Sequence, residues 1–261
     1  MSGSAHSDSA EYRKRKQYFQ QLLTIYGRNS VYEALLEDGI EAVCLHLSTS
    51  NKPAPILDDI VAKAKALGAD IREHDRLSLS RISKNSKQDQ GVALDIRPKG
   101  FAELDAKTHF DASRAQEYIA LDRITNPQNL GMIVRSVCAS EIAGLIIPRR
   151  GCARLDALVI KASAGTLFRA PILRCEHVHE ALADARAQGC DVVGLDLRAK
   201  STLAELRSRD TRIFVLGNES EGLSDEVRAL CNQRVRIPMA NGVESLNVAI
   251  TASLIALRHQ L

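Results

Sequence analysis

Aromatic residues are scarce in this chain. It has no tryptophan, and aromatic side chains account for only 4% of its 261 residues. Proteins that hold single-stranded nucleic acid without sequence preference stack successive bases on aromatic side chains. The sequence therefore predicts few stacking platforms, so any nucleic-acid contact should lean on phosphate groups.

Long apolar runs are also missing, and none approaches the roughly 18 residues that a membrane-spanning helix needs. The first residues, MSGSAHSDSAEYRKRKQYFQQ, include basic side chains but no apolar core behind them, which is not the pattern of a secretory signal. We therefore expect a cytoplasmic protein with no membrane partner. The basic cluster at residues 13–16 is either a solvated helix face or an arm that contacts phosphate.

Familiar ligand-binding patterns do not occur. None of the six cysteines forms a C-x-x-C pair and no histidine stands at zinc-like spacing near them, so we expect reduced thiols and no metal site. The chain also lacks both G-x-G-x-x-G and G-x-x-x-x-G-K-[ST]. These absences argue against an ordinary dinucleotide or nucleoside-triphosphate enzyme. The net charge of +3 permits an RNA partner without requiring one.

The first part of the chain predicts a small α/β domain over residues 25–97. A polar extension with a helix over 11–24 precedes it, and a linker over 98–115 follows, because periodicity is lost there. Within the domain we expect strands at 42–47, 69–74 and 91–96, and helices at 30–38 (capped by Asn29), from Pro55 to Gly68, and at 77–82.

Residues 116–261 alternate between short apolar strands and amphipathic helices. This alternation predicts a parallel sheet with helices on both faces, in which ligands bind beyond the carboxyl ends of the strands. The expected strands are 118–122, 145–148, 190–197, 212–217 and 234–238, and the expected helices are 129–141, 155–163, 177–188, 202–208, 223–231 and 245–259.

Three strand-end segments carry polar residues. In LDRITNPQNLGMIVRS (121–136) a helix starts near Asn129, and Arg135 follows in the same helix. Asn129 as a helix cap would explain the asparagine but not the arginine. In FVLGNESEGLSDEV (214–227), Gly217 and Gly222 flank a polar loop and let backbone approach a ligand, and Ser224 caps the next helix.

The third segment is RIPMANGVESLNVAITASLIAL (236–257), in which a strand ends at Pro238 and an apolar helix follows. Taken alone, Ser245 is a cap for that helix. Each of the three segments has an ordinary structural explanation when it is considered by itself.

Together, the segments resemble the SPOUT superfamily of RNA methyltransferases, in its SpoU branch that methylates ribose 2′-hydroxyls. The resemblance covers 118–261 and includes N-x-G with G-x-x-x-R, G-x-E-x-x-G-L, I-P-M followed by E-S-L-N-V, and the segment KASAGTLFRAPI (161–172). YGRNSVYEALLEDG (26–39) and QGVALDI (90–96) resemble the substrate-binding domain of ribosomal-RNA members, which is itself similar to small ribosomal proteins. Family members usually carry histidine before Q-G-V, where this chain has Asp89.

The resemblance implies a deep C-terminal trefoil knot, a homodimer formed through the catalytic domain, and S-adenosylmethionine as the methyl donor. The last helix, VAITASLIALRHQL, serves either as part of that interface or as plain core. By matching position, the implied cofactor pocket comprises Leu216, Gly217, Glu219, Gly222, Ile237, Met239, Ser245, Leu246 and Asn247, with Ser163 and Thr166 nearby. The implied catalytic cluster comprises Asn129, Arg135, Glu219, Ser245 and Asn247.

Alternatives to this function remain open at the level of sequence. The favoured RNA is ribosomal, with a guanosine as the target by analogy, and transfer RNA is the alternative. A knotted RNA-binding or assembly factor without activity would have lost the catalytic residues, which are intact here. A base-methylating SPOUT enzyme would usually lack the N-x-G…R and E-S-L-N pair.

Overall fold

The computed structural model describes residues 22–111, 114–206 and 211–260, and it divides into two compact units between Lys99 and Gly100. The basic cluster at 13–16 and residues 11–21 of the first expected helix lie outside the described residues. That helix does not extend to residue 24, because Leu23–Tyr26 form strand β1. The strand is stabilised by antiparallel pairing with β4, a long-range contact that the local pattern does not contain.

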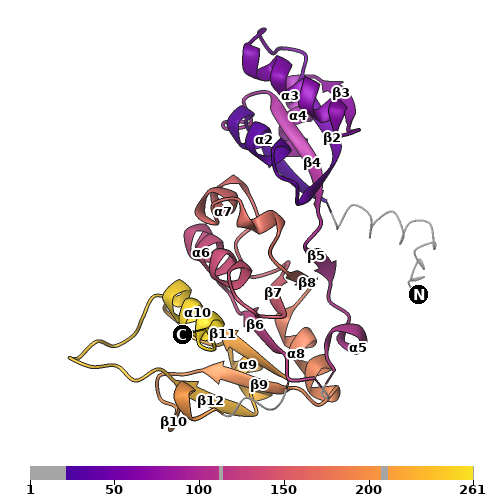
Figure 1. Ribbon diagram of the computed structural model, residues 1–261. Helices are drawn as coiled ribbons and strands as arrows, with labels where there is room; N and C mark the ends of the chain where they lie inside the picture. Colours follow the sequence, from indigo (N-terminus) through magenta and orange to yellow (C-terminus); the bar gives the residue numbers. More distant parts are fainter. Residues whose placement is uncertain (1–21, 112–113, 207–210, 261) are drawn as a thin grey trace, which may run out of the picture. The chain divides into compact units, whose positions relative to one another are not determined.

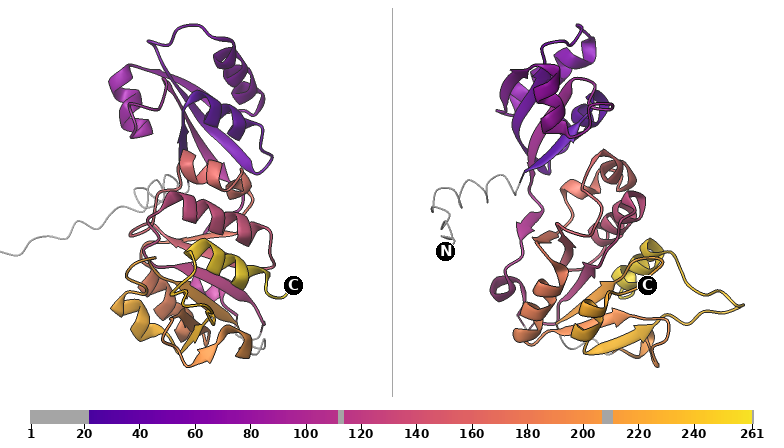
Figure 2. Two further views of the ribbon diagram at one scale, coloured as in Figure 1. Left: turned by 90° about the vertical axis from the view of Figure 1, so that its left-hand side faces the viewer. Right: turned by 180° about the vertical axis from the view of Figure 1, so that it is seen from behind.

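The first unit is a four-stranded sheet in the order β1-β4-β2-β3, in which β2 and β3 are parallel and β4 runs antiparallel to its neighbours. Helices α2 and α3 pack together on one face, and α4 lies on the other (Figure 2). Its elements after β1 are α2 (Arg28–Leu35), β2 (Ile40–Ser48), α3 (Pro55–Ala66), β3 (Asp70–His74), α4 (Arg76–Ser83) and β4 (Val92–Pro98).

The start of α2 differs from the expectation that Asn29 caps a helix beginning at residue 30. The capping position is Gly27, which provides no side-chain hydrogen bond and has a φ of 89°. The Gly27 amide donates to the Val92 carbonyl at 3.0 Å, so the chain passes from the sheet into the helix at the glycine. A positive φ is easily adopted by glycine, which explains how so abrupt an entry is possible.

The second unit is an eight-stranded sheet in the order β10-β12-β9-β11-β6-β7-β8-β5, and all its pairs are parallel. Helices α6, α7 and α10 cover one face and α5, α8 and α9 the other, as predicted (Figure 1). The strands are β5 (Phe101–Glu103), β6 (Glu117–Leu121), β7 (Gly144–Pro148), β8 (Ile172–Cys175), β9 (Asp191–Leu195), β10 (Ser201–Thr202), β11 (Arg212–Leu216) and β12 (Gln233–Arg236). The helices are α5 (Ala106–His109), α6 (Pro127–Cys138), α7 (Ala157–Ala162), α8 (Val178–Ala187), α9 (Asp225–Leu230) and α10 (Val248–Leu257), with short 3-10 turns at Thr166–Phe168 and Leu203–Glu205.

Parts of this sheet differ from the sequence-based expectation. Strand β5 lies in the segment expected to be a linker and pairs with β8, a strand that the sequence did not predict. The expected helix over 202–208 is represented by the single turn Leu203–Glu205, and residues 207–210 lie outside the described part. Short strands of this kind are stabilised by their neighbours in the sheet rather than by local preference.

All six cysteines are free thiols, as expected for a reduced protein. Burial raises the pKa of the Cys175 thiol to about 12 and the pKa of Cys152 to about 11, so both are protonated near neutral pH. Among the described residues, none of the helices combines the length and apolarity needed to cross a bilayer.

Candidate functional site

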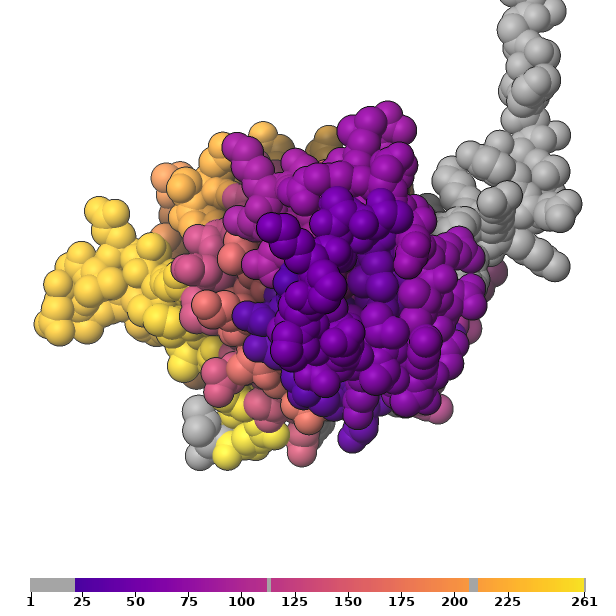
Figure 3. Space-filling model, turned by 90° about the horizontal axis from the view of Figure 1, so that it is seen from above, coloured from indigo at the N-terminus to yellow at the C-terminus, as the bar shows by residue number. Residues whose placement is uncertain are grey.

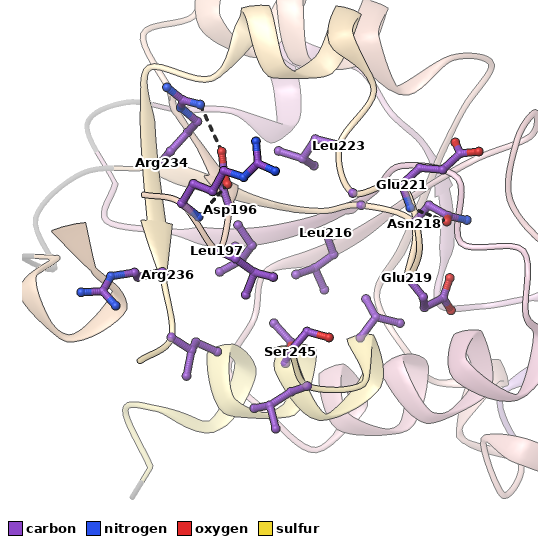
Figure 4. A pocket seen from close by; sticks show the side chains of 18 of the residues that line it. Asp196, Leu197, Leu216, Asn218, Glu219, Glu221, Leu223, Arg234, Arg236 and Ser245 are labelled. Carbon is purple, nitrogen blue, oxygen red and sulfur yellow. Dashed lines mark hydrogen bonds and ion pairs between the residues drawn. The ribbon is translucent and has the colours of Figure 1, made fainter. Parts of the chain in front are cut away.

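A cavity of about 570 Å³ opens at the carboxyl ends of β9, β11 and β12 (Figure 4). Its wall is built mainly by the residues after β9, the loop after β11, the end of β12 with the residues that follow it, and the start of α10, with Arg228 of α9 added. Such an edge is where parallel sheets bind ligands, because the loops there all face the same way. The volume falls within the range of about 300–1,000 Å³ that is common for small-molecule sites.

The loop after β11 is fixed to the end of β6. Asp122 is buried and accepts a 2.6 Å hydrogen bond from the Ser224 amide. Asn218 donates to the Arg123 carbonyl at 3.0 Å and accepts from the Ser220 amide at 2.9 Å. Arg123 also contacts the Glu221 carboxylate. The loop therefore has a defined shape before any ligand is bound.

Gly217 has to be glycine for this loop to close. A Cβ at this position would lie 2.3 Å from the Gly222 carbonyl carbon and 2.5 Å from the Leu223 nitrogen. Because both neighbours are backbone atoms, neither can rotate away as a side chain could. The close approach folds the loop back on itself beside the cavity.

Three side chains from distant segments form one hydrogen-bonded chain. The Asn129 side-chain amide donates to Glu219 Oε1 at 2.5 Å, and the Asn247 amide donates to Asn129 Oδ1 at 3.0 Å. Asn129 is only 6% exposed. Glu219 lines the cavity, and Asn247 stands between two other lining residues, Leu246 and Val248. The chain thus joins the three strand-end segments singled out in the sequence.

Helix capping explains why these amides are available, and it corrects two expectations. The cap of α6 is Asn126, whose side chain accepts from the Gln128 amide at 2.8 Å, so Asn129 lies inside the helix. The cap of α10 is Asn247, which accepts from the Ala249 amide at 2.8 Å, rather than Ser245. Ser224 does cap α9 as predicted. Asn247 therefore serves as a cap with its oxygen and bonds Asn129 with its nitrogen.

The residues expected around the cofactor divide into those that line this cavity and those that do not. The lining includes Leu216, Gly217, Glu219, Gly222, Ile237, Met239, Ser245 and Leu246. Asn247, Ser163 and Thr166 are not part of it. Ser163 is fully buried and donates to the Ile160 carbonyl.

Arg135 lies apart from the other predicted catalytic residues. Six positions along a helix turn a side chain by about 240° relative to Asn129. Arg135 is accordingly exposed on α6, on the same side as Gln128 and Met132, and it neither lines the cavity nor bonds the Asn129 chain within the described residues. Gly131 of the same motif is needed for packing, because a Cβ there would lie 2.4 Å from the Ala162 Cβ.

Sequence reasoning missed the charged side of the cavity. Asp196 pairs with Arg234 at 3.1 Å, and Arg236 lies beyond them along β12 (Figure 4). Asp196 directly follows strand β9, so the rule that sites gather at carboxyl ends could have pointed to it. No comparable pattern pointed to the two arginines, because alternating charges along a strand are typical of an ordinary solvent-facing edge.

Comparison with known proteins identifies both units. Residues 116–257 match the family described as the SpoU rRNA Methylase family. Residues 24–102 match the family described as RNA 2′-O ribose methyltransferase substrate binding. The first match spans more than half of the chain and includes all three polar segments.

Relatives that match most of the chain are also named as RNA methyltransferases. Proteins named "Uncharacterized tRNA/rRNA methyltransferase" from Mycobacterium avium (strain 104) and Mycobacterium leprae (strain TN) are each 36% identical, covering 89% of this chain and 75% of their own length. The SpoU methyltransferase AviRb from Streptomyces viridochromogenes, solved with the cofactor AdoMet, has a TM-score of 0.65 at 22% identity, covering 97% of this chain and 94% of its own. The AdoMet-bound rRNA methyltransferase from Sinorhizobium meliloti has a TM-score of 0.62 at 24% identity, covering 95% of this chain and 91% of its own. These two solved structures share the fold.

Proposed function

Because this chain belongs to the SpoU rRNA Methylase family of RNA 2′-O ribose methyltransferases, we propose that it transfers the methyl group of S-adenosylmethionine to a ribose 2′-hydroxyl of ribosomal RNA. The observation that carries this proposal is the hydrogen-bonded chain of Glu219, Asn129 and Asn247, with Glu219 facing the cavity. The chain joins the three polar segments at one place on the sheet edge.

The cavity suits S-adenosylmethionine in size and chemistry. Leu216, Leu223 and Val248 supply apolar wall, and the close loop at Gly217 exposes backbone groups. When bound, this cofactor supplies a methyl group on a positively charged sulfonium. Glu219 is a carboxylate beside the cavity, and an opposite charge at short range stabilises a cation. We also expect segments 214–227 and 236–257 to form the trefoil knot that the family resemblance implies.

The chain's own residues then have separate tasks. Asn129 fixes the Glu219 carboxylate, and Asn247 fixes Asn129, so the carboxylate is held in one orientation before RNA binds. Arg135 is proposed to grip a phosphate next to the target ribose and to stabilise negative charge that develops on the 2′-oxygen. A guanidinium, with a pKa above about 12, is a poor proton acceptor, so we assign it no role as a base.

We further propose that the protein works as a homodimer in which α6 and α10 face a second copy. Met132 on α6 and Ile250 and Leu254 on α10 are apolar and 42%, 51% and 38% exposed. The two helices pack against each other, and Ser136 and Ser253 are linked by a 2.7 Å hydrogen bond. Arg135 is on the exposed side of α6 with Met132, so a dimer formed through this face would carry it into the interface.

The dimer is tested by sedimentation of the full-length protein and of Leu254→Glu. We expect a dimer for the wild type and a monomer for the variant, because a carboxylate would have to be buried in the interface. Leu77→Glu is the matched control, since Leu77 is also an exposed leucine but lies in the first unit. A monomeric wild type, or a dimeric Leu254→Glu, would contradict the proposal.

Ribosomal RNA is favoured over transfer RNA, and a guanosine is the expected target nucleotide. The match of 24–102 to the substrate-binding family supports a preference for a structured RNA, and the mycobacterial relatives are named for both RNA classes. The purified protein is incubated with radiolabelled S-adenosylmethionine and either deproteinised ribosomal RNA or transfer RNA. Digestion to nucleosides and mass spectrometry then identify the product. A 2′-O-methylated nucleoside from ribosomal RNA is expected; a base-methylated product, or label in transfer RNA alone, would contradict the proposal.

A further inference from the structure

A second hollow, of about 530 Å³, lies in the first unit, whose surface is drawn in indigo to magenta in Figure 3. It is formed by the start of α2, the loop after β2, the start of α4 and the residue before Gly91. The lining residues are Arg28, Ser50, Asn51, Lys52, Arg76 and Gln90. Half of these side chains are cationic and none is acidic.

Gly91 and Gly27 bring the walls of this hollow together. A Cβ on Gly91 would lie 2.0 Å from Asn51 Oδ1, and the Asn51 amide donates to the Gly91 carbonyl at 2.8 Å. On the other side, Gly27 turns the chain into α2 so that the Arg28 amide donates to Gln90 Oε1 at 3.1 Å. The two sequence motifs YGRNS and QGV therefore meet at this place.

The Arg28 guanidinium is held in position by neutral acceptors. Its Nε donates to the Gln90 carbonyl at 3.3 Å, and its Nη2 donates to Asn51 Oδ1 at 3.5 Å. Its Nη1 makes no hydrogen bond to the described part of the chain. The side chain is thus oriented while its charge is not neutralised, which is the state in which an arginine fork recognises phosphate.

The other two cations are also left without a carboxylate. Arg76 donates to the Ser86 carbonyl at 3.3 Å, and Lys52 is exposed. No salt bridge joins Arg28, Lys52 or Arg76 to an acidic group in the described residues. Two other arginines of the unit are paired, since Arg72 lies 3.4 Å from Asp70 and Arg97 lies 2.7 Å from Glu41. In the hollow, by contrast, the three cations line one concave surface that has no carboxylate among its lining residues.

Asp89, which stands where the family usually has histidine, does not cancel this charge. Its carboxylate is buried, at 2% exposure, and accepts from the Ser83 hydroxyl at 2.9 Å and from the Gly91 amide at 3.0 Å. These bonds hold Gln90 in a left-handed conformation with φ of 52°. The aspartate therefore shapes the loop that presents Gln90 and does not point a negative charge at a ligand.

We propose that Arg28, Lys52 and Arg76 bind the sugar–phosphate backbone of the substrate RNA, with Arg28 clasping one phosphate and the two exposed cations contacting its neighbours. The inference rests on RNA being the substrate in the proposed function. It names the residues through which the first unit, already matched to the substrate-binding family, would hold the RNA backbone. Neutralising phosphates releases counterions, so each of the three contacts adds about 0.7–0.9 to the slope of log affinity against log salt.

The test measures binding of a fluorescein-labelled RNA hairpin to the full-length protein by anisotropy over a range of KCl concentrations. Lys52→Gln with Arg76→Gln should weaken binding about tenfold or more at low salt and reduce the salt slope by about 1.5. Arg28→Lys keeps the charge but loses the fork, so we expect weaker binding with an unchanged slope. Because Arg28 also ties two loops together, its variant is accompanied by a thermal melt, whereas the double variant removes only one internal hydrogen bond.

Arg72→Gln is the matched control, since it removes an exposed charge from β3 of the same unit, and it should bind the hairpin as the wild type does. Wild-type affinity and slope in the double variant, or an equal loss in Arg72→Gln, would overturn the inference. Calorimetric titration with S-adenosylmethionine separates the two proposals. A protein that binds no S-adenosylmethionine but still loses RNA affinity in the double variant would refute the proposed function and leave this site standing.

Discussion

In the second unit all strand pairs are parallel, whereas in the first unit β4 runs antiparallel to both of its neighbours. The parallel arrangement sends the ends of β9, β11 and β12 to one edge, and polar residues after those strands converge on one cavity. In the mixed sheet, strand ends point in opposite directions and share no such edge. Its functional candidates instead lie where loops meet, around Arg28.

The two units also bury polar side chains for different purposes. In the first, His46 lies between His74 at 2.9 Å and Asp95 at 3.1 Å, and Thr24 donates to Asp95 at 2.6 Å. These residues belong to four adjacent strands, so the bonds hold the sheet together. In the second, Asn129, Glu219 and Asn247 join segments that are not neighbouring strands, and they lead to a cavity. We therefore expect the network around Asn129 to matter for the site, and the network around His46 to matter for the stability of the first unit.

The largest expected effect tests the second network. Asn129→Ala should lower the single-turnover rate of methyl transfer by about 100- to 1,000-fold, because one preorganised polar group typically contributes that much. The rate is measured with radiolabelled S-adenosylmethionine and ribosomal RNA. Gln188→Ala, at an exposed glutamine directly after α8 on the other face of the sheet, should retain the wild-type rate. Near-normal activity in Asn129→Ala would remove the network from the mechanism.

A smaller effect is expected at the cavity loop. Gly217→Ala should weaken binding of S-adenosylmethionine about tenfold or more, since overpacking costs about 1–3 kcal/mol and the new Cβ meets backbone atoms. Calorimetry measures the dissociation constant. Ser201→Ala, at an exposed position of β10 outside the cavity lining, should bind normally. Unaltered binding in Gly217→Ala would mean that the loop does not contact the cofactor.

A loss of about 1 kcal/mol in unfolding free energy is expected for Ser224→Ala, which removes the side-chain cap of α9. Chemical denaturation followed by circular dichroism measures the change, with Ser201→Ala again as the reference. A change no larger than in the reference would show that the cap contributes nothing to the second unit.

The smallest effect concerns the pH dependence of the first unit. Partial burial and the neighbouring His46 lower the pKa of His74. Burial alone would raise the pKa of Asp95, but hydrogen bonds from His46 and Thr24 outweigh it, so that pKa is lowered as well. A lowered pKa means that the unfolded chain binds the proton better. The stabilising contribution of each group is therefore fully present above its unfolded pKa, which is about 6.5 for histidine and 3.9 for aspartate. That contribution is lost as the pH falls below this value.

Between pH 8 and pH 5 the contribution of His74 should accordingly be lost, while that of Asp95 should persist. Thermal unfolding of the wild type and of His74→Gln at both pH values measures this difference. We expect the wild type to lose more stability on acidification than the variant does. The same loss in both proteins would contradict the assignment.

Much of the fold could be predicted from local patterns, because most strands and helices are long enough to show their period. Strand β8 could not, since Ile172–Cys175 is short, follows a proline and includes Arg174; pairing with β7 and β5 makes it a strand. Strand β1 was missed because it is also only four residues long and is stabilised by its pairing with β4.

In the site, the residues of the cavity loop were predicted by resemblance, but the sequence pattern named Ser245 instead of Asn247 as the cap of α10. Both residue types cap helices, and the contact with Asn129 that distinguishes them lies 118 positions away in the sequence. The resemblance implied that Arg135 and Asn129 belong to one catalytic cluster, and within a single chain helix geometry places the two on different sides of α6.

The bond between Asn129 and Asn247 has a consequence for biosynthesis. Chains emerge from the ribosome at about 5–20 residues per second, so roughly 6–24 s pass between the synthesis of the two asparagines. Throughout that interval the nascent polypeptide lacks this bond, because the second asparagine has not yet been made. On the proposed function, a translation product truncated before residue 247 would therefore lack this part of the methyl-transfer site.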